Sequence, residues 1–298
     1  MKIIITGAGG FLGSELVTQL LKSKKDIVYA LTSHPELLQK KWDKEKNVLV
    51  LEKNSLFNSI IKVDKKDVLI NCAFPRDIQE DMAGGLEYVK DVIQTSVDAG
   101  VGAVINISSQ SVYGTRREKY VTEAGKIHLE SQYAVGKYAT ELLTQSLCRN
   151  IAYTNIRLAS MIGPGFDQRV TNKLIDIALK QKCISINTGK QYWGFLDVVD
   201  GAKGIISLLS LEPGKWKKMY NLGGEKAYTL LEIAETISLV LNKYYGIKIS
   251  IKCIPDEKIF SSGLDSSSLK KDTGFWANTS LEESVLRITQ QKLKFGGE

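Results

Sequence analysis

The sequence is poor in residues that bind transition metals or cross-link chains. Its 298 residues include only 4 cysteines and 2 histidines, and no Cys-x-x-Cys pair occurs. A zinc site needs such residues at close spacing, so we predict no metal site. We expect the cysteines to be buried, reduced thiols; they are Cys72, Cys148, Cys183 and Cys253.

Signals of disorder, membrane insertion and export are also missing. Only 5 prolines and no low-complexity tract occur, which argues against a disordered chain. No apolar run reaches the roughly 20 residues that a membrane-spanning helix needs. The sequence starts with Met1-Lys2 directly before Ile3-Ile4-Ile5, without the pattern of a signal peptide. We therefore expect a cytoplasmic protein with no membrane partner.

Acidic residues are outnumbered, 33 against 40 Lys and Arg, which gives a net charge of +7. The basic residues are dispersed and mixed with acids, as they are in residues 40–46. We interpret them as a solvated surface, although the excess charge would also attract phosphorylated small molecules. We do not expect nucleic acid as a partner.

Short apolar runs alternate with stretches of helical periodicity in the first half of the chain. The runs predict strands at Lys2–Thr6, Ile27–Leu31, Val48–Leu51, Val68–Asn71, Val104–Ile107 and Ala152–Leu158. Helices are predicted between them, including Phe11–Lys22, Asp77–Ala99 and Gln132–Arg149. Such alternation predicts an α/β fold, with a doubly wound parallel sheet between two layers of helices.

A glycine loop joins the first strand to the first helix, in Thr6-Gly7-Ala8-Gly9-Gly10-Phe11-Leu12-Gly13. Gly7 allows the tight turn, Gly10 lets backbone N–H groups approach a pyrophosphate, and Gly13 lets the helix pack closely on the strand. An anion then lies at the positive end of the helix. We predict dinucleotide binding at Gly7, Gly10, Phe11, Leu12 and Gly13.

The fold class that follows is a Rossmann-type sheet with a smaller, interleaved α/β substrate-binding lobe. We assign residues 1–160 to the dinucleotide-binding domain, with residues 195–222 returning to it. Residues 161–194 and 223–298 form the expected lobe, because strand–helix alternation loosens after Leu158 and Gly163-Pro164-Gly165 breaks the chain.

The end of the second strand bears on the choice of cofactor. A carboxylate there would bind the adenosine ribose of NAD, but the sequence is Leu31-Thr32-Ser33-His34, without an acid. Hydroxyls and a histidine suit the 2′-phosphate of NADP (NADPH) better, and NAD remains the alternative. We expect further cofactor contacts from Thr32, Ser33, Asn54 and Ala73, and either Lys40 or Lys41 would reach the phosphate if it is not a surface residue.

Tyr133 and Lys137 lie four residues apart, and therefore on one face of their predicted helix. An ammonium one turn from a phenol lowers the phenol's pKa from its ordinary value of about 10. A tyrosine of this kind can exchange a proton with a substrate oxygen near neutral pH. Tyr-x-x-x-Lys also occurs by chance on solvated helices, so the glycine loop and Ser109 give the pair its weight.

With these residues in place, the chain resembles the extended short-chain dehydrogenase/reductase family. Its nucleotide-sugar branch contains epimerases, dehydratases, decarboxylases and 4-ketoreductases. The resemblance rests on the glycine loop, Ser108-Ser109-Gln110-Ser111-Val112-Tyr113-Gly114, Tyr133-x-x-x-Lys137, and Arg157 through Gly163-Pro164-Gly165. Weaker similarities are Phe195-Leu196-Asp197-Val198-Val199-Asp200, Tyr220-Asn221-Leu222-Gly223 and Thr229-Leu230-Leu231-Glu232-Ile233.

The resemblance implies a role for each member of the catalytic set. Ser109 would hydrogen-bond the substrate oxygen, Tyr133 would be the general acid, and Lys137 would hold the nicotinamide ribose and tune Tyr133. Ser108 and Ser111 suit the hydroxyl role equally well on local sequence, and only the offset from Val112-Tyr113-Gly114 selects Ser109.

Gln110 and Ser111 stand where related dehydratases carry an Asp-Glu pair and related decarboxylases a Glu. Neither can take a proton from carbon, which leaves simple hydride transfer. We predict NADPH-dependent reduction of a keto group, at C4, on a nucleotide-linked deoxysugar. The alternatives are an NAD-dependent nucleotide-sugar 4-epimerase and, less favoured, a non-enzymatic dinucleotide-sensing or RNA-binding relative.

The resemblance also places the substrate and a partner subunit. A nucleotide-diphosphate sugar would contact Arg76, Ser109, Ser160, Arg169 and Trp193, although ordinary surface or capping roles are equally open for the charged residues. The helices predicted at Asp77–Ala99 and Gln132–Arg149 form the usual dimer interface of the family, which implies a homodimer.

Overall fold

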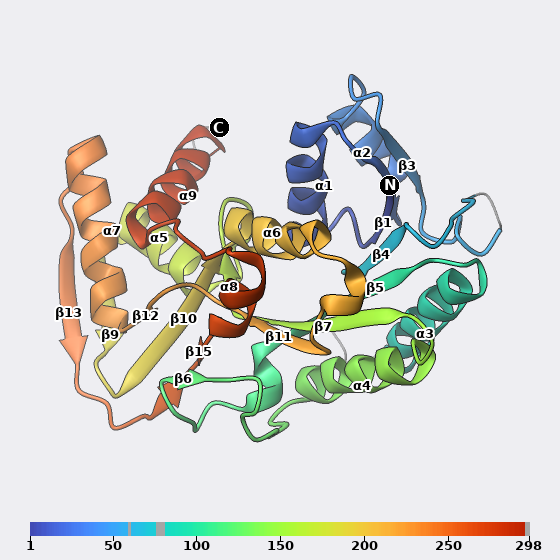
Figure 1. Ribbon diagram of the computed structural model, residues 1–298. Helices are drawn as coiled ribbons and strands as arrows, with labels where there is room; N and C mark the ends of the chain where they lie inside the picture. The colour runs from blue at the N-terminus through green and yellow to red at the C-terminus, as the bar shows by residue number, and fades with distance from the viewer. Residues whose placement is uncertain (59–60, 76–80, 296–298) are drawn as a thin grey trace.

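The computed structural model describes residues 1–58, 61–75 and 81–295. Within these residues the largest sheet has seven strands in the order β11-β7-β5-β4-β1-β2-β3, all parallel (Figure 1). Its strands are β1 (Lys2–Thr6), β2 (Ile27–Thr32), β3 (Val48–Glu52), β4 (Val68–Asn71), β5 (Ala103–Ser109), β7 (Ala152–Leu158) and β11 (Met219–Leu222). The predicted parallel α/β fold is confirmed.

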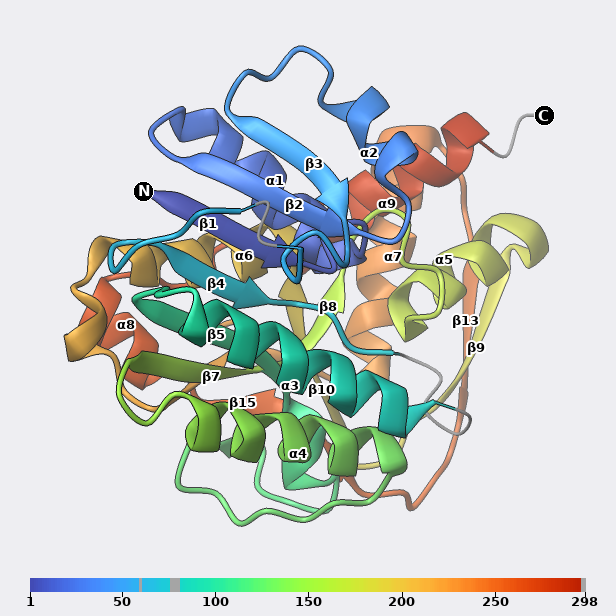
Figure 2. The ribbon, with the colours of Figure 1, turned by 90° about the vertical axis from the view of Figure 1, so that its right-hand side faces the viewer.

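Helices cover both faces of this sheet (Figure 2). One face carries α1 (Phe11–Ser23) and α6 (Val198–Ser207), and the other carries α3 (Met82–Asp98) and α4 (Gln132–Leu147). Successive side chains of a strand point to opposite faces, which explains the unbroken run of isoleucines in β1. Ile3 and Ile5 pack in the α1 layer, and Ile4 packs in the α3 layer.

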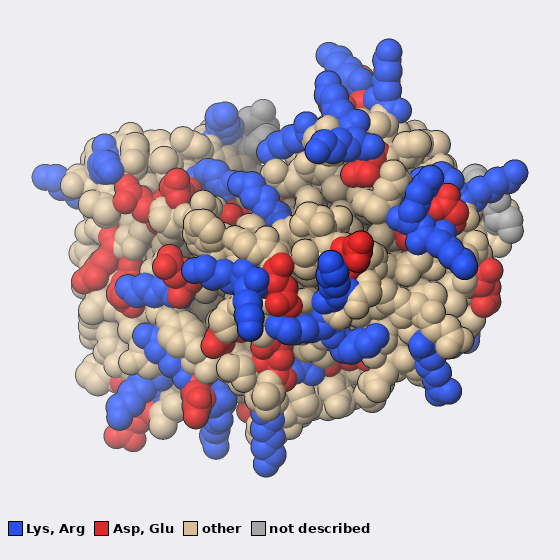
Figure 3. Space-filling model, viewed as in Figure 1, with Lys and Arg blue, Asp and Glu red and all other residues tan. Residues whose placement is uncertain are grey.

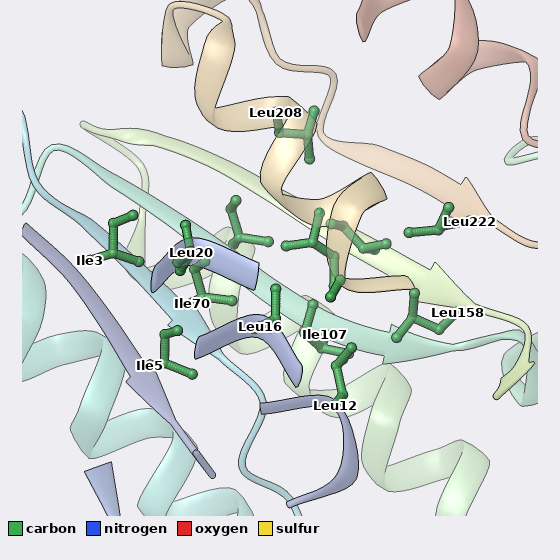
Figure 4. Close-up of a cluster of buried hydrophobic side chains, with 14 of the residues drawn as sticks. Ile3, Ile5, Leu12, Leu16, Leu20, Ile70, Ile107, Leu158, Leu208 and Leu222 are labelled. Atoms are coloured by element: carbon green, nitrogen blue, oxygen red, sulfur yellow. The ribbon is translucent and has the colours of Figure 1, made fainter. Parts of the chain in front are cut away.

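The α1 layer forms the larger apolar core (Figure 4). Leu12, Leu16 and Leu20 repeat at helical spacing and pack onto side chains of the sheet. Leu16 is fully buried, and so are Ile3, Ile4 and Ile5 of β1. The carboxyl ends of β1, β4, β5 and β7 are thus fixed relative to α1, and loops after these strands carry the residues discussed below.

A second apolar core lies beyond the sheet, on the side where β10 and α7 are labelled in Figure 1. Its helices are α5 (Val170–Gln181), α7 (Leu230–Tyr245) and α9 (Leu281–Phe295). Its strands are β8 (Ser160–Ile162), β9 (Cys183–Asn187), β10 (Gln191–Asp197), β12 (Ala227–Tyr228), β13 (Ser250–Ile254) and β14 (Phe260–Ser261). The lobe boundaries given above stay a prediction, which we retain as a proposal.

The remaining elements are short. They are α2 (Pro35–Lys41), α8 (Ser267–Thr273), the 3₁₀ turns η1 (Gln110–Tyr113), η2 (Leu208–Ser210) and η3 (Pro213–Lys215), and the paired strands β6 (Tyr120–Val121) and β15 (Gly263–Leu264).

Two carboxylates of the Asp197–Asp200 segment connect the two cores. Asp197 caps α6 through the backbone N–H of Val199, at 2.9 Å, and also accepts a hydrogen bond from Ser284 of α9. Asp200 accepts the backbone N–H groups of Asn278 and Thr279, at 3.0 and 2.7 Å. These buried carboxylates therefore fix the C-terminal segment to the helix that covers the sheet.

Several sequence predictions need adjustment. The helix predicted from Asp77 begins at Met82 in the described residues, and Asp77 itself lies outside them. The expectation that all four cysteines are buried holds only for Cys148: Cys72 and Cys183 are partly exposed, and Cys253 is exposed on β13, which forms a two-stranded sheet with β9. Basic and acidic side chains are intermixed over the face seen in Figure 3, as the sequence indicated.

Among the described residues, no helix is long and apolar enough to span a bilayer. The same residues contain no cluster of three or more His, Cys, Asp or Glu side chains suited to a metal ion.

Candidate active site

Two adjacent cavities open at the carboxyl edge of the sheet. The β2-side cavity, of about 500 Å³, is lined by residues following β2, β3 and β4, including Thr32 and Lys53. The β5-side cavity, of about 460 Å³, is lined by residues following β5 and β7 and by the start of α4. Gly7, Gly10 and Phe74 line both, so the glycine loop lies where the two cavities meet.

The glycine loop has the backbone that the sequence predicts. Gly7 has a φ of +66°, and a Cβ on Gly13 would lie 2.2 Å from the Gly7 carbonyl oxygen. Larger residues at either position would strain the turn or push α1 from the strand. The N-cap of α1 is Gly10, so the positive end of the helix faces the shared wall of the cavities. This loop fits the pyrophosphate of a dinucleotide.

Ser109 ends β5 and lines the β5-side cavity. Its Oγ accepts hydrogen bonds from the backbone N–H of Ser111, at 3.2 Å, and from the Ser111 hydroxyl, at 3.0 Å. Because both bonds use its lone pairs, the Ser109 hydroxyl hydrogen remains able to donate to a ligand oxygen. The neighbouring Ser108 hydroxyl is instead committed to Glu141, at 2.5 Å.

Tyr133 and Lys137 lie one turn apart at the start of α4, and both line the same cavity as Ser109. Lys137 is only 5% exposed, and its Nζ donates to the Ile107 carbonyl oxygen at 2.8 Å. Phe74 contacts both side chains: its ring centroid is 4.8 Å from the Lys137 Nζ and 6.3 Å from the Tyr133 ring centroid. Burial lowers the pKa of Lys137 from 10.5 to about 8, against the raising effect of Cys72 and Glu141.

A buried ion pair lies behind the Ser109 strand. Arg157 of β7 donates from Nε and Nη2 to the two carboxylate oxygens of Glu141, at 2.9 and 2.7 Å. Burial alone would lower the pKa of Arg157, but the hydrogen bonds and charge of Glu141 raise it above its ordinary value. The pair links α4, which carries Tyr133, to the strand beside Ser109, and so fixes their relative positions.

A chain of buried amides crosses the sheet close to the same edge. Asn71 donates to Asn106 at 2.9 Å, Asn106 donates to Asn155 at 2.8 Å, and Thr6 donates to Asn71 at 2.7 Å. Four neighbouring strands are therefore held in register just below the loops of the site. The sequence did not indicate this series of hydrogen bonds, since a single Asn within a strand forms no recognisable motif.

The β2-side cavity is less constrained. Thr32, Ser33 and His34 all line it, and Lys53 joins them from the end of β3. His34 is 72% exposed. The end of β2 supplies no carboxylate, although Asp81 at the start of α3 lines another part of the wall.

Most of the sequence-predicted site residues come together in these two cavities. The residues that line one or both are Gly7, Gly10, Phe11, Leu12, Gly13, Thr32, Ser33, Ala73, Ser109, Tyr133, Lys137, Ser160 and Arg169. Phe74, Cys72 and Lys53 also line them and were not predicted. Each follows a strand of the sheet, and the rule that ligands bind at carboxyl ends of parallel strands would have indicated them.

Two predicted contacts lie elsewhere, and a third falls outside the described residues. Asn54 is exposed and does not line either cavity, because the chain turns away after Lys53. Trp193 lies in β10 with its ring tilted against that of Phe260, the ring centroids 4.4 Å apart, and it lines neither cavity. Arg76 lies outside the described residues.

An aromatic contact joins the glycine loop to the segment between β8 and α5. Phe11, at the start of α1, stacks on Phe166 with ring centroids 4.4 Å apart. The Arg169 guanidinium carbon lies 4.8 Å from the centroid of the same Phe166 ring. Lys292 of α9 binds Asp167 at 2.7 Å and Asp176 at 2.8 Å, which anchors this segment to the second core.

The chain is similar in sequence to a known protein family and to individual known proteins. Residues 3–223 match the model of the NAD dependent epimerase/dehydratase family. Protein CapI of Staphylococcus aureus is 26% identical over 281 residues, covering 82% of this chain and 84% of CapI. UDP-glucuronic acid decarboxylase 3 of Arabidopsis thaliana is 28% identical over 281 residues, covering 86% and 79%.

Solved structures share the fold over almost the whole chain. UDP-glucuronic acid 4-epimerase from Bacillus cereus, in complex with NAD, superimposes with a TM-score of 0.81 at 21% identity, covering 100% of this chain and 99% of that one. The dTDP-glucose 4,6-dehydratase DesIV from Streptomyces venezuelae, with NAD bound, has a TM-score of 0.81 at 20% identity, covering 100% and 98%.

Proposed function

The chain belongs to the NAD dependent epimerase/dehydratase family, and from that premise we propose that it transfers a hydride at C4 of a nucleotide-linked sugar. The preferred reaction is NADPH-dependent reduction of a 4-keto group. One observation carries this proposal. The lining of the β5-side cavity combines Ser109, Tyr133 and Lys137 but, in the described residues, contains no Asp, Glu or His.

The lining defines which steps this chain can assist. Ser109 has a hydroxyl hydrogen able to bind the carbonyl oxygen, and Tyr133 supplies the proton that this oxygen needs on reduction. The Lys137 ammonium, held by its hydrogen bond to the Ile107 carbonyl, stabilises the phenolate that Tyr133 becomes after it has given up its proton. When bound, the nicotinamide supplies the hydride; the glycine loop and Lys137 would hold the dinucleotide.

The described lining carries no carboxylate, which argues against the other reactions of the family. Elimination and carbanion chemistry need a base beside the carbon next to the carbonyl. Gln110 and Ser111, which follow Ser109 into the same cavity, cannot act as that base. The part of the lining that the structure describes supports transfer of a hydride from the cofactor and of a proton from Tyr133.

The cofactor preference rests on the β2-side cavity. Thr32, Ser33 and Lys53 offer hydroxyls and a cation to a 2′-phosphate, and β2 ends without a carboxylate. The test is a fluorescence titration of the chain with NADPH and with NADH. Tighter binding of NADPH supports the proposal, and a clear preference for NADH would remove it.

A 4-epimerase is the second candidate, and the fold comparison favours it. The UDP-glucuronic acid 4-epimerase of Bacillus cereus binds NAD, and its structure covers this whole chain. A 4-epimerase oxidises and then reduces the same carbon, which needs the same three side chains and no further base. Incubation with a UDP-hexose and no added cofactor separates the two: formation of the epimer by protein that retains NAD would overturn the reductase.

The substrate and the assembly complete the proposal. Ser160 and Arg169 line the β5-side cavity, where they would contact the sugar diphosphate.

Val135 and Leu142 are 43% and 50% exposed on α4, and we expect α3 and α4 to pair with those of a second copy. Light scattering checks the mass in solution, and a panel of nucleotide 4-keto sugars with NADPH, including the predicted 6-deoxysugars, checks the reaction.

A further inference from the structure

A third cavity lies apart from the two that form the candidate active site. It has a volume of about 560 Å³ and is lined by the chain around β6, which is labelled in Figure 1; we call it the β6 cavity. It shares no lining residue with the β2-side or the β5-side cavity. Its described lining residues all fall within 113–128, and most of them are exposed, so the cavity opens to solvent. A cavity of this size can hold a ligand as large as a nucleotide.

Positive charge dominates the wall of the β6 cavity. The side chains that can carry it are Arg116, Arg117, Lys126 and His128, and the one carboxylate of the described lining is that of Glu118. Among the described residues, neither arginine nor Lys126 forms an ion pair. The Nδ1 of His128 lies 3.4 Å from a carboxylate oxygen of Glu130, which does not line the cavity. The wall therefore has a net positive charge that attracts an anion.

Arg117 is the cation of this wall that is most separated from water. Its Nε donates to the Ser261 carbonyl oxygen at 3.0 Å, and one Nη donates to the Gln110 side chain at 2.5 Å. The other Nη is buried and has no hydrogen-bond partner in the described residues. Burial lowers the pKa of Arg117 from 12.5 to about 10, against the raising effects of Tyr113 and Glu130. Desolvation of an unpaired charge is expensive, so an anion that pairs with this guanidinium would be bound favourably.

Arg117 also connects the β6 cavity to the active site. Gln110, which accepts its hydrogen bond, lines the β5-side cavity directly after Ser109. A guanidinium can only donate, so the side-chain oxygen of Gln110 faces Arg117. An anion in the β6 cavity that draws the guanidinium toward itself would weaken this hydrogen bond. The position of Gln110 in the active site would then depend on whether the β6 cavity is occupied.

We propose that the β6 cavity is an effector site for a small molecule that carries a phosphate group, and that its occupant acts on the active site through Arg117 and Gln110. A phosphate group suits this wall because its oxygens can accept two parallel hydrogen bonds from a guanidinium and a further one from the Lys126 ammonium. Inorganic phosphates and nucleotides share this chemistry. The site itself does not depend on the proposed function; only the effect on turnover rests on it.

Calorimetry on protein saturated with its dinucleotide tests the site, because the glycine loop is then already filled. The probes are inorganic pyrophosphate and AMP, with adenosine as the uncharged control. We expect adenosine to bind at least about tenfold more weakly than AMP, since it lacks the charge-assisted hydrogen bonds. Tighter binding of AMP than of pyrophosphate would identify a nucleotide as the effector, and the reverse an inorganic phosphate.

Two pairs of variants at exposed positions locate the bound phosphate without disturbing the core. Ala124→Glu adds a carboxylate to the wall and should weaken phosphate binding by more than about tenfold, whereas Ala124→Gln adds the same bulk without charge and should change it by less than about threefold. Lys126→Met removes a cation of the wall and should weaken binding by about five- to tenfold. Lys119→Met, at a neighbouring position outside the lining, is its matched control and should have no effect.

Turnover tests the connection to the active site. With a nucleotide sugar that serves as substrate, pyrophosphate should raise KM by about fivefold and then reach a plateau, because effector and substrate bind together. Competition inside the β5-side cavity would instead raise KM without limit. Ala124→Glu should abolish the plateau effect, and Ala124→Gln should keep it.

The outcomes separate the effector site from the proposed function. Absence of phosphate binding, or binding that Ala124→Glu and Lys126→Met leave unchanged, overturns the effector site. Binding that is lost in Arg169→Met but kept in those two variants lies in the β5-side cavity and overturns it as well. Phosphate binding in the β6 cavity without any change in KM overturns the connection through Gln110. Phosphate binding there without turnover of any nucleotide sugar overturns the proposed function and leaves the effector site standing.

Discussion

The two cavities are built in different ways. On the β5 side, Lys137 is 5% exposed and bonded to a backbone carbonyl, Ser109 accepts two hydrogen bonds, and a buried ion pair lies behind both. On the β2 side, Leu37 is 66% exposed and His34 is 72% exposed. The β5-side cavity, where we propose that the reaction takes place (the reacting end), is thus preorganised by groups that cannot move independently. At the other end a few solvated side chains would decide which dinucleotide binds, so single substitutions there should have modest effects.

Tyr133→Phe tests the reacting end directly, and we expect it to have the largest effect. Removing the phenolic proton should lower kcat by about 100- to 10,000-fold, the usual contribution of a general acid. Cofactor affinity should change little, because Lys137 and the glycine loop remain. Steady-state kinetics and a binding titration measure the two quantities, and weakened binding with retained turnover would contradict the assignment.

Glu141→Ala should break the support behind the reacting end. It leaves the Arg157 charge buried without a partner, which costs about 3–5 kcal/mol of unfolding free energy. The matched control is Glu282→Ala, which removes a surface partner of Lys243 and should lower the free energy of unfolding far less, because solvent screens an exposed pair. Denaturant unfolding measures both, and equal losses would show that the buried pair gives no special support.

The pH dependence of activity and of stability provides a third test of how the β5-side cavity is built. Lys137 has a pKa of about 8, so above pH 8 its ammonium neutralises and activity should fall by up to tenfold per pH unit. The free energy of unfolding should not fall over the same pH range. Between about pH 8 and 10.5 the unfolded chain binds more protons at this residue than the folded one, so this contribution to stability rises with pH. Loss of activity that follows unfolding would refute the assignment.

Ser33→Asp tests the β2-side cavity, and we expect the smallest effect there. A carboxylate at this position repels a 2′-phosphate and accepts hydrogen bonds from ribose hydroxyls, so the NADPH-to-NADH affinity ratio should fall about tenfold. Asn54→Asp places the same charge at an exposed position outside the cavity and should leave the ratio nearly unchanged. If both variants shift the ratio equally, the effect is general electrostatics and the cavity does not select the cofactor.

The sequence predicts the sheet well because its strands are short, buried apolar runs. Lys2–Thr6, Val68–Asn71 and Ala152–Leu158 have the bounds predicted from the pattern. The structure brings the glycine loop, Ser109, Tyr133 and Lys137 to one cavity, as their spacing and the family resemblance predicted, and their roles stay a prediction.

The features of the fold and the site that the sequence did not predict depend on contacts between residues far apart along the chain. Arg117 meets Ser261 across 144 positions, and Tyr113 donates to Asn221 across 108 positions. No local pattern indicates such pairs. Trp193 was predicted in the site by its position and the family resemblance, but its ring packs against that of Phe260.

The stack of Phe11 on Phe166 has a consequence for the timing of the reaction. It joins the glycine loop to a segment that Lys292 anchors to the second core, so a ligand held by the loop lies at a contact between the two halves of the molecule. We expect the dwell time of the dinucleotide to depend on how often these rings part. An enzyme of this design would load its cofactor before the sugar and release it last, once in each round of reduction.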